Sequence, residues 1–158
     1  MRTERGFTLI EILVVIVIIG ISASFIMIAI GDFGAKRQVT TSAEQLSSYI
    51  KLLQQRAILS GDTLGIKLSS EGYEPYLLSN NKWQTLSKKG LFHYYAFPKK
   101  TKLSFKKNLS KMPDIIIYNS GDLNDFEVHF GTENEPHILT LIGQNNGQIM
   151  LIHRENDK

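Results

Sequence analysis

An apolar run near the N-terminus constrains this chain of 158 residues more than any other feature. From Ile12 to Gly31 there is no charged side chain, and most positions are Ile, Val, Leu, Met or Phe. About twenty such residues are what a helix needs to cross the hydrocarbon core of a bilayer. Because a single segment in lipid can satisfy its backbone polar groups only as a helix, the sequence predicts one membrane-spanning helix.

One acid, Glu11, lies at the start of this run. Ionisable groups at membrane depth are costly and usually have a function. A secretory signal peptide would have a shorter apolar region that ends at a small-residue cleavage site. A plain membrane anchor explains Arg2 and Arg5 by the positive-inside rule, but it does not explain why Glu11 follows Gly6 and Phe7 so closely.

The segment Gly6-Phe7-Thr8-Leu9-Ile10-Glu11 resembles the N-terminus of type IV pilins and of type II secretion pseudopilins. The resemblance implies that residues 1–6 are a leader, which the prepilin peptidase removes after Gly6. It also implies that Phe7 becomes the N-methylated first residue of the mature chain. Glu11 would then act in assembly by neutralising the terminal amine of a neighbouring subunit, because an unpaired ion in low dielectric costs several kcal/mol.

Beyond residue 31 the helical pattern becomes amphipathic. Apolar residues recur alternately four and three positions apart, which places them on one helix face: Val39, Ala43, Leu46, Ile50, Leu53 and Ala57. Ser60-Gly61 provides a stop, since glycine suits the left-handed conformation that ends helices. We therefore expect one helix from about Thr8 to Ser60, with residues 7–31 in the membrane and 32–60 packed on a globular domain of residues 61–158.

The globular part has the alternation and the turn residues of β-structure. The expected strands are Leu64–Leu68, Tyr73–Ser79, Lys82–Leu86, His93–Phe97, Leu103–Phe105, Ile115–Tyr118, Phe126–Phe130, His137–Gly143 and Gln148–His153. The apolar run Ile115–Tyr118 suggests a strand buried on both faces, and Asn146-Gly147 suits a type I′ turn. Trp83 is expected to pack rather than to bind a ligand.

This pattern predicts an α+β, pilin-like fold, in which a long N-terminal helix packs on antiparallel β-sheets, as two small sheets. The helix end from Leu52 to Ile58, and the order of strands and turns after Ile115, also resemble the H-type minor pseudopilins and their FimT pilus relatives. The chain has no cysteine, although such a domain would lie in an oxidising compartment.

No catalytic motif is present, so we do not expect an enzyme, a metal or a cofactor. The four histidines occur singly on predicted strands, and only His129 and His137 could approach each other across a hairpin. Major pseudopilins of this class use an acidic loop for calcium, but the acids here lack the ligand rhythm of a calcium loop. Those acids are Asp114, Asp122, Asp125, Glu133 and Glu135.

A lysine-rich stretch without acids extends from Pro75 to Pro113. Its candidate contact residues are Lys99, Lys100, Lys102, Lys106 and Lys107. Near Tyr94, Tyr95 and Phe105 they could supply phosphate contacts and base stacking for nucleic acid. They could equally be a solvated edge-strand face, or bind an acidic partner subunit or anionic headgroups. Nucleic acid is the less favoured partner, because the stretch lacks arginine and Gly147 is not followed by the arginines of DNA-binding FimT relatives.

The preferred interpretation is a minor pseudopilin of the H type, which assembles through its N-terminal helix into a type II secretion pseudopilus and helps to push folded proteins across the outer membrane. The alternative is a FimT-like minor pilin that binds DNA during uptake. The resemblance implies a bacterial inner-membrane protein with a single span and a periplasmic C-terminal domain. The implied partners are other minor and major pseudopilins, the prepilin peptidase and the inner-membrane assembly platform.

Overall fold

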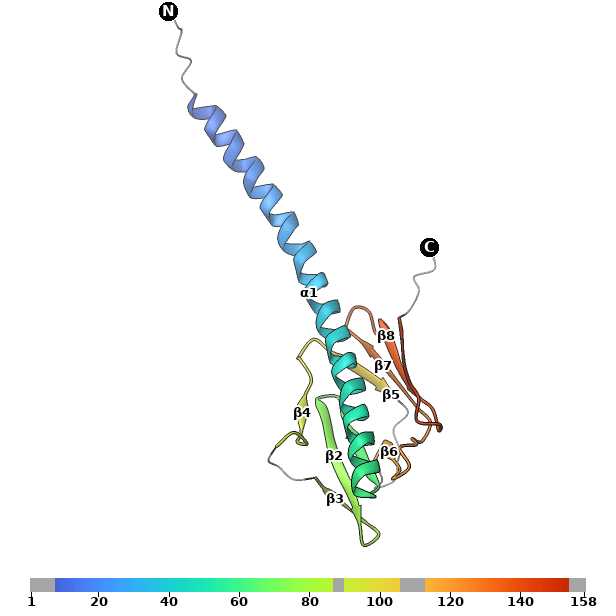
Figure 1. Cartoon of the computed structure of the whole chain (residues 1–158). Helices are drawn as coiled ribbons and strands as arrows, with labels where there is room; N and C mark the ends of the chain where they lie inside the picture. The colour runs from blue at the N-terminus through green and yellow to red at the C-terminus, as the bar shows by residue number, and fades with distance from the viewer. Residues whose placement is uncertain (1–7, 87–89, 106–112, 154–158) are drawn as a thin grey trace, which may run out of the picture. The chain divides into compact units, whose positions relative to one another are not determined.

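The computed structural model describes residues 8–86, 90–105 and 113–153, without the side chains of residues 23–33. The chain divides into two compact units, residues 1–34 and 35–158, which are described separately. A single helix, α1, is assigned from Leu9 to Ser60 and therefore contributes to both units (Figure 1). These bounds agree with the helix predicted from about Thr8 to Ser60.

In the first unit, the described side chains of α1 from Thr8 to Ser22 are not covered by other described residues. Every described side chain from Thr8 to Ser22 is exposed, including Ile10 at 70% and Ile19 at 61%. The predicted membrane segment also includes positions 23 to 31, whose side chains lie outside the description. Among the described residues, no helix has the length and apolarity needed to cross a membrane.

In the second unit, one face of α1 forms the centre of the core. The six apolar residues predicted to share a face, Val39, Ala43, Leu46, Ile50, Leu53 and Ala57, all have zero exposure. The helix ends where Gly61 adopts a positive φ of 72° and donates its amide to the carbonyl of Ala57 at 2.9 Å. The glycine stop is therefore confirmed.

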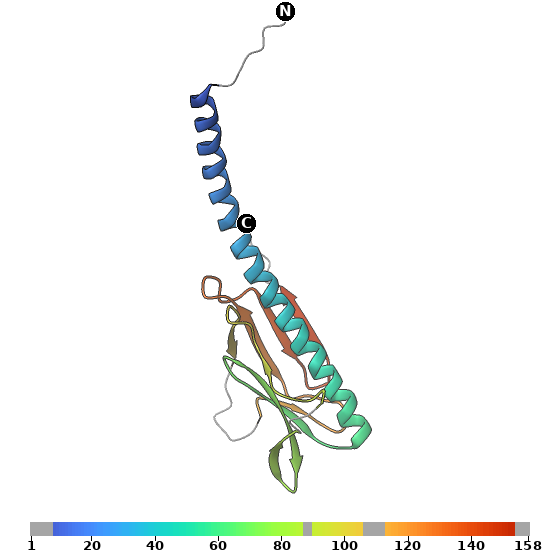
Figure 2. The same cartoon turned by 90° about the vertical axis from the view of Figure 1, so that its left-hand side faces the viewer.

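Two antiparallel sheets cover this face of the helix (Figures 1 and 2). The first sheet has the order β3-β2-β1-β6, with β4 on β2. Its strands are β1 (Leu64–Leu68), β2 (Gly72–Ser79), β3 (Lys82–Thr85), β4 (Tyr95–Ala96) and β6 (Ile115–Ile117). The second has the order β5-β7-β8-β9, from β5 (Lys102–Phe105), β7 (Phe126–Gly131), β8 (Leu139–Gly143) and β9 (Ile149–His153).

The inner faces of both sheets join α1 in one hydrophobic core. Leu64 and Ile66 come from the first sheet, Phe130 and Leu141 from the second, and all four have zero exposure. In β8, buried residues alternate with half-buried ones, as is typical of antiparallel sheets with one face on the core. The α+β, pilin-like architecture predicted from the sequence is confirmed.

Three details differ from the predictions. The turn before β9 is not type I′, because only Gly147 there has a positive φ, of 80°; the type I′ signature occurs at Asn80 and Asn81, with φ of 49° and 60°. β6 is an edge strand on which Ile116 is only half-buried. The strand predicted over His93–Phe97 shrinks to the two residues of β4, because Phe92, Tyr95 and Phe97 turn toward the core.

Candidate functional site

Of the N-terminal motif, the structure describes Thr8 to Glu11, and Gly6 and Phe7 lie outside the described residues. The Thr8 amide donates to the Glu11 carboxylate at 3.5 Å, and the Glu11 amide donates to Thr8 Oγ1 at 3.4 Å. This reciprocal pair is a capping box, the arrangement favoured by a Thr-x-x-Glu sequence at a helix start. Sequence reasoning overlooked it, although the spacing from Thr8 to Glu11 was visible. Glu11 therefore has a local partner within its own chain.

Gln54, near the end of α1, holds two turns of the globular unit. Its side-chain amide donates to the carbonyl of Gly121 at 2.8 Å and to that of Gly147 at 2.9 Å. Both glycines have positive φ, and Gly147 lies so close that an added Cβ would be 2.9 Å from the Gly121 oxygen. Gln54 belongs to the stretch Leu52–Ile58, in which the sequence resembles the H-type family.

Three of the five candidate lysines are described, and all three are exposed. Lys99 and Lys100 occupy a turn closed by a 2.8 Å hydrogen bond from the Thr101 amide to the Pro98 carbonyl. Lys102 opens β5, an edge strand. Lys106 and Lys107 lie outside the described residues.

The aromatic residues expected to stack bases with these lysines mostly pack elsewhere. Phe105 and Tyr95 pack against the core, and Tyr95 stacks on Tyr73 with ring centroids 5.4 Å apart. Burial, with the neighbouring phenols, raises the pKa of both Tyr49 and Tyr73 well above its usual range. Tyr94 remains 45% exposed. The predicted platform of three aromatic side chains is therefore not assembled.

Trp83 packs, as predicted. It is half-buried on β3, and its ring and that of Pro113 lie over Gly65 on β1, where an added Cβ would be 3.1 Å from Trp83.

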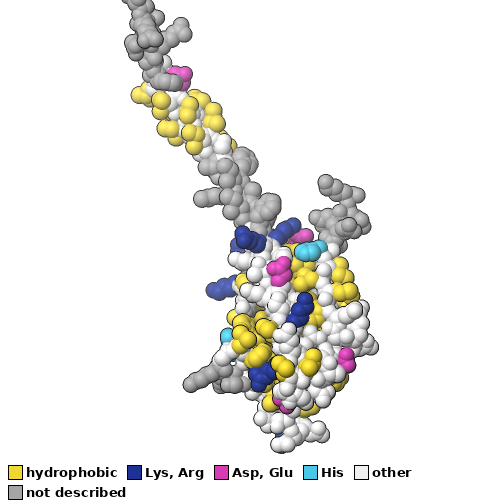
Figure 3. Space-filling view, in the orientation of Figure 1, with side chains coloured by type: hydrophobic (Ala, Val, Ile, Leu, Met, Phe, Trp, Pro, Cys, Tyr) yellow, Lys and Arg dark blue, Asp and Glu magenta, His cyan; other side chains and the backbone are white. Residues whose placement is uncertain are grey.

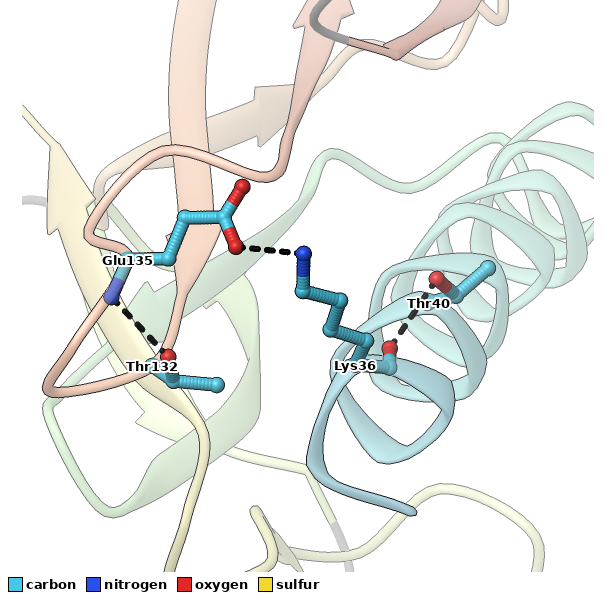
Figure 4. Close-up of polar contacts among 4 residues, drawn as sticks. All are labelled: Lys36, Thr40, Thr132 and Glu135. Atoms are coloured by element: carbon cyan, nitrogen blue, oxygen red, sulfur yellow. Dashed lines mark hydrogen bonds and ion pairs between the residues drawn. The ribbon is translucent and has the colours of Figure 1, made fainter. Parts of the chain in front are cut away.

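An ion pair joins α1 to the loop between β7 and β8 (Figure 4). Lys36 Nζ lies 2.7 Å from Glu135 Oε2, and the loop is held in shape because the Glu135 amide donates to Thr132 Oγ1 at 3.1 Å. The side chains are 51% and 35% exposed, so the pair contributes little stability. The contact shows that the β7–β8 loop lies beside the start of the helix in this unit.

The histidines and acids do not gather as a set of metal ligands in the described part of the chain. The His129 and His137 rings meet with centroids 4.8 Å apart, as the hairpin predicted. Within residues 8–86, 90–105 and 113–153, no three metal-ligating side chains come together. The acids have structural partners instead: Asp114 accepts from the Leu68 amide at 2.8 Å, and Asp125 from the Asn145 amide at 2.9 Å.

A groove of about 850 Å³ separates the two sheets. Its walls carry both apolar side chains, such as Phe126 and Ile142, and polar ones, such as Asn124 and Glu127. Asn124 is tied to the edge of β6, since its Oδ1 accepts from the Ile116 amide at 2.6 Å and its Nδ2 donates to the Asp114 carbonyl at 3.1 Å. The Asn124 side chain therefore serves the fold.

Comparison with known proteins shows what these features are similar to. Residues 1–27 match the model of the prokaryotic N-terminal methylation motif. Type II secretion system protein H of Pseudomonas aeruginosa is 26% identical over 147 aligned positions, which cover 81% of this chain and 83% of the relative. The protein of the same name from Vibrio cholerae is 27% identical, covering 85% and 71%. The chain is thus similar, over most of its length, to proteins named type II secretion system protein H.

The fold of this chain also has a solved counterpart. The crystal structure of the minor pseudopilin EpsH from the type II secretion system of Vibrio cholerae is similar, with a TM-score of 0.65 and 19% identity. The match covers 78% of this chain and 99% of that structure. At this identity the likeness supports the pilin-like fold, which agrees with the sheets and helix described above.

Proposed function

We propose that this minor pseudopilin is a structural subunit of a type II secretion pseudopilus that assembles through the first half of α1. The observation that carries the proposal is the apolar, uncovered helix: Leu9 to Ile21 is exposed along its whole length although most of its side chains are apolar. A helix that is apolar on all sides needs lipid or other helices around it. A bilayer before assembly and sibling helices afterwards satisfy this need in turn.

Processing and the charge of Glu11 complete the mechanism. Cleavage after Gly6 by the prepilin peptidase gives a mature chain that starts with N-methylated Phe7, whose amine carries a positive charge. The Glu11 carboxylate, which caps the helix start within its own chain, then pairs with the amine of a neighbouring subunit. Such a head-to-tail, non-closing contact generates a filament. Growth of the filament would push folded cargo through the outer membrane.

The proposal sets the location and partners of the chain. The apolar half of α1 anchors it once in the bacterial inner membrane, with residues 35–158 in the periplasm. Its partners are other minor and major pseudopilins, the prepilin peptidase and the inner-membrane assembly platform. Its role is structural rather than catalytic, in keeping with the family.

The alternative of a FimT-like pilin that binds DNA receives less support. Lys99, Lys100 and Lys102 are exposed, but Tyr95 and Phe105 pack against the core instead of offering stacking faces. Proteins that bind single strands usually combine a basic groove with stacking aromatics.

Complementation of a strain that lacks this chain separates the two functions. We expect deletion to leave secreted enzymes inside the cell, and the wild-type chain, with a mature N-terminus at N-methylated Phe7 by mass spectrometry, to restore their release. Glu44→Gln, which removes the charge of an exposed acid elsewhere on α1, is the control and should restore release as the wild-type chain does. If the deletion strain secretes its enzymes normally but no longer takes up DNA, the chain is a DNA-binding pilin rather than a secretion subunit.

A further inference from the structure

Two groups of positive charge lie at the same end of the globular unit. Lys36 and Arg37 are its second and third residues. Thr101, which follows Lys100 and is buried, shares a 3.4 Å hydrogen bond with Ser42 on α1. Ser42 comes less than two helical turns after Lys36. The Lys99–Lys102 turn is therefore held beside the first turns of α1 in this unit.

The loop after β7 closes the same end of the unit. Lys102 lies in register opposite Gly131, the last residue of β7, and Lys36 pairs with Glu135 in the loop that follows (Figure 4). Figure 3 shows Lys and Arg side chains gathered at this end. We name this surface the basic end and define it as Lys36, Arg37, Lys99, Lys100 and Lys102.

Among the described residues, the cations of the basic end outnumber the acids on the loops that adjoin it. The acids on the adjoining loops are Glu71, Glu133 and Glu135, and Glu135 is used by Lys36. Arg37, Lys99, Lys100 and Lys102 are exposed and have no ion-pair partner among the described residues. Charges left without partners on a surface attract an external counter-charge.

We propose that the basic end binds the anionic phospholipid headgroups of the membrane in which the chain is anchored, an inference that rests on the proposed anchoring. Lys36 follows Gly31, the last residue of the apolar run, by between one and two helical turns. Lysine and arginine next to a membrane segment are attracted by anionic lipids, and the attraction falls off within a Debye length, about 8 Å at physiological ionic strength. The chain itself therefore keeps these charges close to the headgroups.

The chemistry of the basic end favours a diffuse anionic surface over nucleic acid. Four of its five cations are lysines, which act as point charges, whereas bidentate recognition of phosphate favours arginine. Its aromatic neighbours Tyr95 and Phe105 pack against the core and offer no stacking platform. Attraction to lipid holds the globular unit on the bilayer before assembly, and it has to be released when the subunit joins a fibre.

The test uses the full chain reconstituted in vesicles of phosphatidylcholine, with or without phosphatidylglycerol. Because the chain contains no cysteine, Asn134→Cys, in the exposed loop beside Glu135, accepts a single fluorescent donor. Energy transfer to an acceptor on the lipid headgroups then reports how closely the basic end approaches. We expect higher transfer in anionic vesicles, and a return to the neutral-vesicle value in high salt.

The charge variant K99E/K100E should lower the ratio of lipid-contacting to free basic ends more than tenfold in anionic vesicles. The matched control is K51E/K82E, which reverses two exposed lysines on the second half of α1 and on β3, and it should leave the ratio unchanged. Circular dichroism checks that both variants fold. The proposal is overturned if energy transfer is the same in neutral and anionic vesicles, or if K99E/K100E leaves it unchanged. It is also overturned if the chain binds duplex DNA, K99E/K100E abolishes that binding, and energy transfer does not depend on the lipid.

The same experiment distinguishes this inference from the proposed function. A chain that sediments with neither type of vesicle contradicts the membrane anchoring itself. A chain that sediments with both, without charge-dependent transfer, contradicts only the role of the basic end.

Discussion

Gln54, on the last turns of α1, donates its side-chain amide to the carbonyl of Gly147, 2.9 Å away, in the turn that leads into β9. The same nitrogen donates to the Gly121 carbonyl at 2.8 Å, in the connection between β6 and β7. One side chain thus joins the helix to the connection after β6 of the first sheet and to the β8–β9 turn of the second. Because both carbonyls are partly buried, the contacts have no easy replacement by water.

Gln54→Ala should therefore destabilise the fold. Loss of the donor leaves two carbonyls without their partner, and we expect the free energy of unfolding to fall by about 1–3 kcal/mol. Urea denaturation followed by circular dichroism measures this change. Gln55→Ala is the matched control, because Gln55 is exposed on the same helix. Equal losses for the two variants would show that the double hydrogen bond is not important for stability.

Gly147→Ala should also destabilise the fold, for two separable reasons. The residue has a φ of 80°, where a side chain is strained, and an added Cβ would lie 2.9 Å from the Gly121 oxygen. Gly90→Ala isolates the first reason, because Gly90 has a φ of 103° but open space around it. We expect Gly90→Ala to cost about 1–3 kcal/mol and Gly147→Ala to cost more. The opposite order of midpoints in urea would contradict the close approach at Gly147.

The sequence predicts the helix and most strands because their periodicity reflects burial directly. Val39 to Ala57 alternate by three and four, and each apolar position predicted on that face is fully buried. Turn geometry was harder to predict, since Asn146-Gly147 and Asn80-Asn81 have similar residues but different backbone angles. The turn type depends on how each turn contacts the rest of the molecule. Gln54 donates to the turn at Asn146-Gly147, whereas Asn80-Asn81 has no such contact with Gln54 among the described residues.

Only the part of the candidate site that forms a local sequence motif could be predicted. Thr8 to Glu11 is a contiguous motif, and its capping box follows from spacing alone. The basic end depends on long-range contacts, since the Ser42–Thr101 hydrogen bond joins residues that are distant in sequence. Lys36 and Arg37 could not be grouped with Lys99 and Lys100 before the sheet topology was known.

Tyr49, Tyr73 and Tyr76 should titrate late. Burial raises the pKa of Tyr49, Tyr73 and Tyr76 above the usual value, which is about 10 in an unfolded chain. Because the folded chain holds these phenol protons more tightly than the unfolded chain, they contribute to the free energy of unfolding. This contribution is complete below pH 10 and is lost as the pH rises above 10. Absorbance at alkaline pH should show part of the six tyrosines ionising late and together with unfolding. Simultaneous ionisation of all six in folded protein would contradict their burial.

Glu11→Gln and Thr8→Ala should separate the two roles proposed for the N-terminal motif. Glu11→Gln keeps an oxygen that can accept from the Thr8 amide, but it removes the negative charge. If that charge pairs with the amine of a neighbouring subunit, its loss leaves a buried ion unpaired, a change of about 3–5 kcal/mol. We expect cross-linking to sibling pseudopilins and release of secreted enzyme to fall by more than about tenfold.

Thr8→Ala has the opposite pattern, because it removes the capping hydroxyl while the Glu11 charge remains. Loss of an N-cap costs about 1 kcal/mol of helix stability, which a helix packed among siblings or lipids tolerates. Cross-linking and secretion should therefore stay near the wild-type level for Thr8→Ala and be lost for Glu11→Gln. If both variants lose assembly equally, the helix cap rather than the charge is the assembly determinant. If neither does, Glu11 serves only its own helix, and the filament contact must be formed by other residues.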